Sequence, residues 1–262
     1  MHISKYFSYN VYEDEWFQED TTLQTDRYLA AAINIQNGSW WITGGIKVVQ
    51  NSPSPLKSTE LSYRNSTTGA LEFTAGVELP RFMTGHCITR VNKTHIFLGG
   101  GNQKIPYLFD ETTSKFIELP SLRHQRSRPA CAVVKYNDGN VSYKSVIMVV
   151  GGHYTNFDIL AATTTEFIDP ANITKWQEGP KISEPFGWSD GGYINFVNDT
   201  GLLLVSGVDQ NEKELNTIYH YNEEDREFKP LRESLKKGRE NPGVVSIPMG
   251  EIECNKTNVQ LL

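Results

Sequence analysis

The stretch HIFLGGGNQKIPYLFDETTSKFIELP, from His95 to Pro120, contains an apolar run that ends in glycines, followed by a loop, an aromatic strand, an acidic turn and another aromatic residue. Glycine weakens the interior of a strand because it has no side chain to pack and loses much backbone entropy on folding. Gly99 and Gly100 therefore need a positional reason, such as a bulge or the close approach of another backbone. That reason becomes apparent once the pattern is seen to recur along the chain.

The chain carries this pattern four times. WWITGG precedes TELSY and LEFTAGVELP, VIMVVGG precedes TTTEFIDP and KWQEGP, and a weaker copy reads GLLLVSG, NTIYHYN and REFKPL. The glycine position moves from Gly44 to Gly99, Gly151 and Ser206, at intervals of 55, 52 and 55 residues. A period near 50 residues, made of four short strands separated by turn residues, predicts the blades of a propeller.

These residues resemble the kelch repeat, whose blades combine an apolar strand ending in Gly-Gly with a downstream Tyr and then a Trp. The Trp is kept at Trp176 and is replaced by Phe73, Phe116 and Phe228 in the other copies. The resemblance implies an all-β fold, a β-propeller of four-stranded kelch blades. It implies little about activity, because one fold hosts many functions.

We expect a single kelch-type domain over residues 1–262 with about five blades, the last of them shared between the termini. Such sharing would remove exposed strand edges; an incomplete larger ring is the alternative. The four strands of a kelch-like blade are called strand a, which is the innermost, and strands b, c and d, which follow in order toward the outside. Four blades are predicted at 25–80, 81–120, 121–180 and 181–231. The shared blade would take its strands c and d from residues 1–17 and its strands a and b from residues 239–262. The a strands of the four blades are expected near 29–35, 84–91, 130–136 and 191–197.

Composition argues against several classes of function. A formal charge of −6 and a pI near 5.6 predict no nucleic-acid surface, which normally needs a basic patch. No run approaches the roughly 18 apolar residues of a membrane span, so we expect no membrane insertion. His86, His124 and His153 lie in separate repeats without metal-ligand spacing, and no nucleophile, nucleotide or calcium motif occurs. The sequence thus predicts no catalytic residue, no metal and no cofactor.

Asn-x-Ser/Thr triplets, the acceptors of N-glycosylation, are numerous in this chain. Most fall in predicted a–b turns and the rest in c–d turns, which would place them all on one face of a propeller and indicates an extracellular or secretory-pathway protein. The alternative is that Asn is simply favoured in hairpin turns, as in a cytoplasmic protein. The triplets begin at Asn37, Asn65, Asn92, Asn140, Asn172, Asn198 and Asn255.

The three cysteines fit an oxidising compartment only loosely. Cys87 and Cys131 occupy matching positions on neighbouring a strands, where a small buried residue suits the inner ring. A disulfide between them is the other possibility. Because the count is odd, at least one thiol, with Cys254 as a candidate, is free or pairs outside this chain.

The face built from d–a and b–c connections is the predicted binding surface. Arginines that precede several a strands could bind the carboxylates of an acidic peptide in bidentate fashion. The resemblance agrees, since kelch-type adaptors of ubiquitin ligases bind acidic peptides on this face. Bracing of loops by the same arginines is the competing interpretation. The predicted ligand-binding residues are Arg27, Arg81, Arg126, Arg239 and Trp188.

We therefore expect a non-catalytic protein-interaction module, secreted or part of an ectodomain, that binds a protein or an acidic peptide. Charge reversal at Arg81 and Arg126 should then weaken binding without unfolding the protein. The alternatives are an intracellular kelch adaptor and a propeller enzyme such as a carbohydrate oxidase.

Overall fold

The structure is a computed structural model that describes residues 6–10, 13–36, 38–50, 52–101, 103–137, 143–152, 162–183, 202–209 and 213–239. The chain divides into two compact units that meet between Thr84 and Gly85. Of the described residues, those up to Thr84 belong to unit 1 and those from Gly85 to Arg239 belong to unit 2, and each unit is described by itself. Within the described ranges, no helix is long and apolar enough to cross a membrane.

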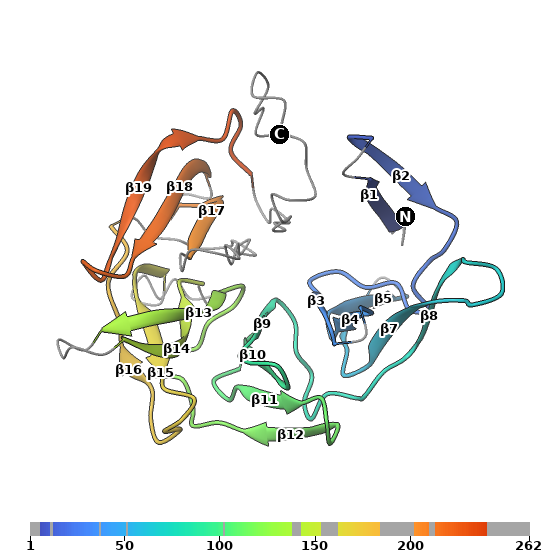
Figure 1. The fold of residues 1–262 in the computed structure, drawn as a ribbon, viewed down its shortest axis with the longest axis horizontal. Helices are drawn as coiled ribbons and strands as arrows, with labels where there is room; N and C mark the ends of the chain where they lie inside the picture. Colours follow the sequence, from blue (N-terminus) through green and yellow to red (C-terminus); the bar gives the residue numbers. More distant parts are fainter. Residues whose placement is uncertain are drawn as a thin grey trace. The chain divides into compact units, whose positions relative to one another are not determined.

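Unit 1 contains one four-stranded antiparallel sheet and two separate hairpins (Figure 1). The sheet has the order β3–β4–β7–β8. One hairpin, β1–β2, precedes the sheet in sequence, and the other, β5–β6, is inserted between β4 and β7. The strands are β1 (Tyr6–Asn10), β2 (Glu15–Glu19), β3 (Ala31–Asn34), β4 (Trp40–Thr43), β5 (Ile46–Val49), β6 (Ser52–Pro55), β7 (Thr59–Arg64) and β8 (Leu71–Ala75).

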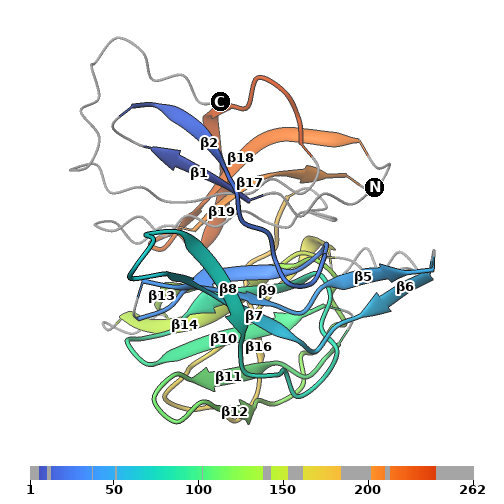
Figure 2. The same ribbon diagram turned by 90° about the vertical axis from the view of Figure 1, so that its right-hand side faces the viewer.

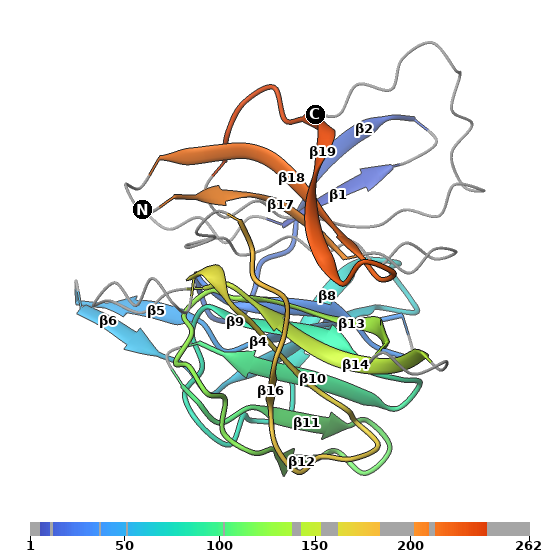
Figure 3. The same ribbon diagram turned by 90° about the vertical axis from the view of Figure 1, so that its left-hand side faces the viewer.

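The described residues of unit 2 form two four-stranded antiparallel sheets, in the orders β9–β10–β11–β12 and β13–β14–β15–β16, and a three-stranded sheet β17–β18–β19 (Figures 1 and 3). In each of these sheets, strands that are hydrogen-bonded neighbours are also consecutive in the sequence. The strands are β9 (His86–Arg90), β10 (His95–Gly100), β11 (Tyr107–Asp110), β12 (Lys115–Glu118), β13 (Ala130–Asn137), β14 (Tyr143–Val150), β15 (Thr165–Ile168), β16 (Gln177–Glu178), β17 (Leu203–Val208), β18 (Glu214–Asn222) and β19 (Glu227–Ser234).

The repeat pattern predicted these sheets correctly. The a strands expected near 29–35, 84–91 and 130–136 are β3, β9 and β13, and the b, c and d strands follow each in order. Phe73, Phe116 and Phe228 lie in the outermost strands of their sheets, and Trp176 directly precedes β16. The a strand expected at 191–197 and the terminal strands expected at 239–262 lie outside the described residues. An all-β fold of antiparallel four-stranded sheets is thus confirmed, whereas closure through a shared blade stays a prediction.

The glycine pairs sit where backbones approach closely, as predicted, but one pair is displaced by one residue. In the second repeat the two left-handed residues are Gly100 and Gly101, with φ of 74° and 73°. They correspond to Gly151 and Gly152, with φ of 58° and 75°. A Cβ on Gly152 would lie 2.8 Å from the carbonyl oxygen of Ser127. The crowding neighbour is therefore the segment leading into an a strand, rather than the aromatic residues of the outer strands.

The core of unit 2 lies between successive sheets. Phe97 on β10 packs against Trp176, with ring centroids 5.9 Å apart, and the indole Nε1 of Trp176 donates a hydrogen bond to the carbonyl oxygen of Pro120 at 2.8 Å. Trp176 thus joins the end of one sheet to the strands of the one before it. Its burial explains why a bulky aromatic residue recurs near the outer strand of each repeat.

Candidate functional site

The connections predicted to form a binding face include an unexpected element in unit 1. Residues 46–57 form the b–c connection of the first repeat, and most of this segment is the hairpin β5–β6 rather than an irregular loop. Its base is tied to the segment before β3, because Tyr28 and Ile46 exchange backbone hydrogen bonds of 3.0 and 2.8 Å. Figure 2 shows the hairpin extending away from β7 and β8.

Arg27, one of the predicted ligand-binding residues, is buried beneath this hairpin with only 1% of its side chain exposed. Its guanidinium donates to the carbonyl oxygens of Gly44 and Ser58 at 2.8 Å, and to Oε1 of Glu60 at 2.6 Å. The carboxylate of Glu60, on β7, also accepts the backbone N–H groups of Gln24 and Thr25. Arg27 therefore ties the b–c connection to the segment that leads into the innermost strand.

Arg126 in unit 2 makes the same contacts. Its guanidinium, with no exposed side-chain surface, donates to the carbonyl oxygens of Gly151 and Thr164 at 2.7 and 3.0 Å, and to Oε1 of Glu166 at 3.0 Å. Glu166, on β15, accepts the backbone N–H groups of Arg123 and His124. The arrangement matches that of Arg27 and Glu60 except at one atom: Nε of Arg126 donates to Oε1 of Glu166, whereas Nε of Arg27 makes no hydrogen bond within the described residues.

These contacts correct the prediction that Arg27 and Arg126 bind a ligand. A guanidinium that is surrounded by carbonyl oxygens and a buried carboxylate presents no donor to solvent, so both arginines brace their sheets. The partners Glu60 and Glu166 were missed, although both follow a Thr at the same place in the quoted repeats TELSY and TTTEF. In the sheet β9–β12 the position that corresponds to Glu60 is occupied by Tyr107. The alignment follows from Lys57 and Lys104, whose carbonyl oxygens accept equivalent hydrogen bonds from Leu79 and Leu122, and each of which lies three residues before the position.

The other predicted ligand-binding residues have different surroundings. Arg81 is exposed in unit 1, in the segment before β9. Arg239 is exposed in unit 2, where its backbone N–H donates to the carbonyl oxygen of Leu215 and its own carbonyl accepts from Gly207. Trp188 lies outside the described residues. Arg27 and Arg81 thus belong to unit 1, and Arg126 and Arg239 belong to unit 2.

Exposed apolar side chains and the exposed Arg81 nevertheless lie on the connections of unit 1, where Lys47 and Lys57 are half-buried. Phe82 is 54% exposed, and Nζ of Lys57 lies 5.2 Å from the centroid of its ring, within cation–π range. Tyr28, Val48 and Val49 are also exposed large apolar residues. We call the set of Tyr28, Lys47, Val48, Lys57, Arg81 and Phe82 the hairpin surface; it includes both faces of the hairpin, since Lys47 and Val48 are consecutive in β5 and point to opposite sides. No acidic residue occurs in the segment 46–57, which contributes half of this set.

The described sequons lie in turns, as the repeat pattern predicted. Asn92 follows β9 in an a–b turn, while Asn65 and Asn172 lie in c–d connections after β7 and β15. Oδ1 of Asn92 accepts the backbone N–H groups of Thr94 and His95, both at 2.9 Å. In such an Asx turn the hydrogen bonds to the backbone are accepted by Oδ1, so the turn does not need Nδ2, the atom to which an N-glycan is attached. The other sequons, at Asn37, Asn140, Asn198 and Asn255, lie outside the described residues.

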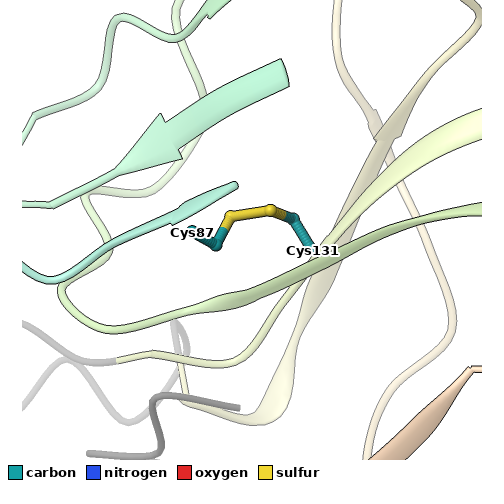
Figure 4. The surroundings of a disulfide bond; sticks show 2 residues. All are labelled: Cys87 and Cys131. Carbon is teal, nitrogen blue, oxygen red and sulfur yellow. A yellow bond between two sulfur atoms is a disulfide. The ribbon is translucent and has the colours of Figure 1, made fainter. Parts of the chain in front are cut away.

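Cys87 and Cys131 form a disulfide bond between β9 and β13 (Figure 4). Their Cα atoms are 5.8 Å apart, within the usual range for a disulfide, and both residues are buried. The expectation that Cys87 and Cys131 are small buried residues was right about their burial, but the two sulfur atoms form a disulfide and are not free thiols. Cys254 lies outside the described residues.

The described ranges contain no group of three or more His, Cys, Asp or Glu side chains that could hold a metal ion. His86 is buried on β9, and burial lowers its pKa to about 4, so the imidazole is neutral at physiological pH. The backbone of His124 donates to Glu166, and His153 lies outside the described residues.

The fold and the hairpin surface define an all-β protein of antiparallel four-stranded sheets with exposed connections at one end of a sheet. The chain matches no family model and no curated protein. Among solved structures it is similar to YjhT, with a TM-score of 0.63 and 13% sequence identity over 86% of this chain and 74% of that one. At this identity the similarity concerns the fold alone, and it is compatible with a propeller-like arrangement.

Proposed function

We propose that this protein is a non-catalytic interaction module, a kelch-type β-propeller whose d–a and b–c connections bind an acidic peptide or an acidic protein segment. The observation that carries the proposal is the hairpin surface, where the exposed Tyr28, Arg81 and Phe82 occur with the half-buried Lys47 and Lys57 on those connections. Exposed aromatic residues and cations are the groups that supply contact area and charge complementarity at interfaces. The sheets and their similarity to YjhT support the propeller, and a ring of about five blades closed by terminal strands is the form that we propose.

The buried ion pairs support this role indirectly. Arg27 and Glu60 hold the base of the hairpin against the segment before β3. A connection that is braced from inside loses less conformational freedom when a partner binds, which favours affinity. We therefore assign ligand contact to Arg81 and to its exposed neighbours in the hairpin surface, with Arg239 and Trp188 as further candidates.

We further propose that the protein matures in the secretory pathway. Disulfides form and persist in oxidising compartments, and the bond between Cys87 and Cys131 fits such an environment. The described sequons lie in polar turns that an oligosaccharyltransferase could reach. An intracellular adaptor would need neither feature.

Reversing the charge of the hairpin surface should weaken binding of acidic peptides. Lys47→Glu combined with Arg81→Glu is expected to lower the affinity for a pool of acidic decapeptides by about tenfold, or about 1.4 kcal/mol, because two favourable charge interactions become repulsive. Fluorescence anisotropy at two salt concentrations measures the change. The matched control is Lys175→Glu, a lysine in the c–d connection before β16, which should leave binding unaltered. Equal affinities for all three proteins would overturn the proposed binding face.

Expression in animal cells should give a glycoprotein. We expect N-glycans on Asn65, Asn92 and Asn172, because each lies in a turn and carries a Ser or Thr two positions later. Peptide mass spectrometry after glycosidase treatment in heavy-oxygen water reports occupancy at each site, and Asn34, which has no following Ser or Thr at that position, is the internal control. Unmodified peptides from secreted protein would contradict the assignment.

A further inference from the structure

The hairpin β5–β6 presents two sheet edges of different character. The N–H of Leu56 donates to the carbonyl oxygen of Gly45, so this pair is hydrogen-bonded across the hairpin. Hydrogen-bonded and non-hydrogen-bonded pairs alternate in an antiparallel ladder. Lys47–Ser54 and Val49–Ser52 are therefore hydrogen-bonded pairs, whereas Ile46–Pro55 and Val48–Pro53 are not. The backbone groups of the latter residues point away from the hairpin.

The outer edge of β6 is closed to another strand. Pro53 and Pro55 occupy the positions whose N–H would point outward, and proline has no N–H to donate. Prolines at these positions are a recognised means of preventing edge-to-edge pairing. The sequence SPSP thus blocks one side of the hairpin and leaves its internal ladder unaffected.

The outer edge of β5 beyond Ile46 is open among the residues that the structure describes. Its first outward residue, Ile46, pairs with Tyr28, and the next, Val48, is 40% exposed. Within the described part of the chain, neither the N–H nor the C=O of Val48 makes a hydrogen bond. The segment before Tyr28 turns toward β7 instead, since the N–H groups of Gln24 and Thr25 donate to Glu60. An unpaired edge of this kind is a template for an added strand.

The side chains on the two faces of the hairpin indicate which sequence an added strand would have. Ile46, Val48 and the prolines share one face, because residues directly opposite each other in a ladder project to the same side. Lys47 lies on the other face with Ser52 and Ser54, and no carboxylate occurs in the hairpin to neutralise it. A strand added at Val48 would place an apolar side chain opposite Val48 and an acidic one opposite Lys47.

We propose that an extended segment with alternating apolar and acidic residues adds to the edge of β5, pairing its backbone with the N–H and C=O of Val48. The inference rests on the proposed function and specifies how its acidic ligand is recognised. Two backbone hydrogen bonds and one charge pair form a small contact, so the affinity is in the weak range of about 0.1–1 mM for a short peptide.

The test uses the full chain and a blocked hexapeptide of alternating Glu and Val, titrated by NMR. Val48→Pro removes the outward N–H without removing a donor of the internal ladder, as Pro53 does on the facing strand, and is expected to weaken binding at least about tenfold. Val48→Ala keeps that N–H and should stay within about threefold of the unmodified protein. A hexapeptide N-methylated at its central residues removes the same hydrogen bonds from the ligand side and should also lose binding. This second measurement keeps the test valid if Val48→Pro does not fold.

Several outcomes would overturn the inference. Equal binding of both hexapeptides, or no binding of either, rules out pairing at the edge of β5. A protein that self-associates, becomes monomeric with Val48→Pro and ignores the hexapeptides would indicate that a second copy of the chain occupies the edge. The proposed function fails separately, when Lys47→Glu with Arg81→Glu leaves the affinity for the acidic decapeptide pool unchanged.

Discussion

Arg126→Met is expected to lower the free energy of unfolding of unit 2 by about 3–5 kcal/mol, the usual cost of leaving one member of a buried ion pair without its partner. Glu166 is 1% exposed and would keep only the backbone N–H groups of Arg123 and His124. The variant also leaves the carbonyl oxygens of Gly151 and Thr164 without the guanidinium that they accept from. Charge reversal at Arg126 should therefore unfold the unit, contrary to the expectation drawn from the sequence.

Urea denaturation followed by tryptophan fluorescence measures this loss. Arg126→Met with Glu166→Gln should recover about half of it, because the buried charge is gone and the amide oxygen still accepts one of the two backbone N–H groups. The matched surface control is Arg123→Ala, which breaks a 3.7 Å pair with Glu178 between two half-exposed side chains and should cost at most about 0.5 kcal/mol. A loss of that same small size for Arg126→Met would show that the buried pair does not stabilise the sheet.

Replacing Cys87 and Cys131 together by alanine is expected to destabilise unit 2 by about 4 kcal/mol. The bond closes a loop with a sequence separation of 44, and in the chain-entropy description a loop of this length restricts the unfolded ensemble by about that amount. Comparing unfolding of the intact protein with and without reductant, and with the double variant, measures the contribution. The reductant should have no further effect on the variant.

Alkylation under denaturing conditions without reductant provides the control. We expect one alkylated cysteine, Cys254, and two protected ones, whereas Cys254→Ala should show none and unfold like the unmodified protein. Alkylation of Cys87 and Cys131 in protein secreted from animal cells would contradict the disulfide, and with it one support for the secretory pathway.

The strands were predictable because their signals are local and repeated. Each b strand is an apolar run that ends in glycine, and each c–d turn begins with Asn or Asp, so the four-strand order could be read at a fixed period. The displacement from Gly99–Gly100 to Gly100–Gly101 has a simple cause. Three consecutive glycines do not reveal which two need positive φ, since that depends on the neighbouring segment that approaches them.

By itself, the sequence determined the class of fold and the places of the strands, since alternation, turn residues and repeat period act along the chain. Tertiary structure alone decided the roles of individual side chains. Arg27 and Arg81 occupy similar places before a strands, yet one lies against Glu60 and the other is exposed. Cys87 and Cys131 form a disulfide because β9 and β13 place their Cα atoms 5.8 Å apart. Burial and pairing depend on which residues from distant segments meet, and no local pattern encodes that meeting.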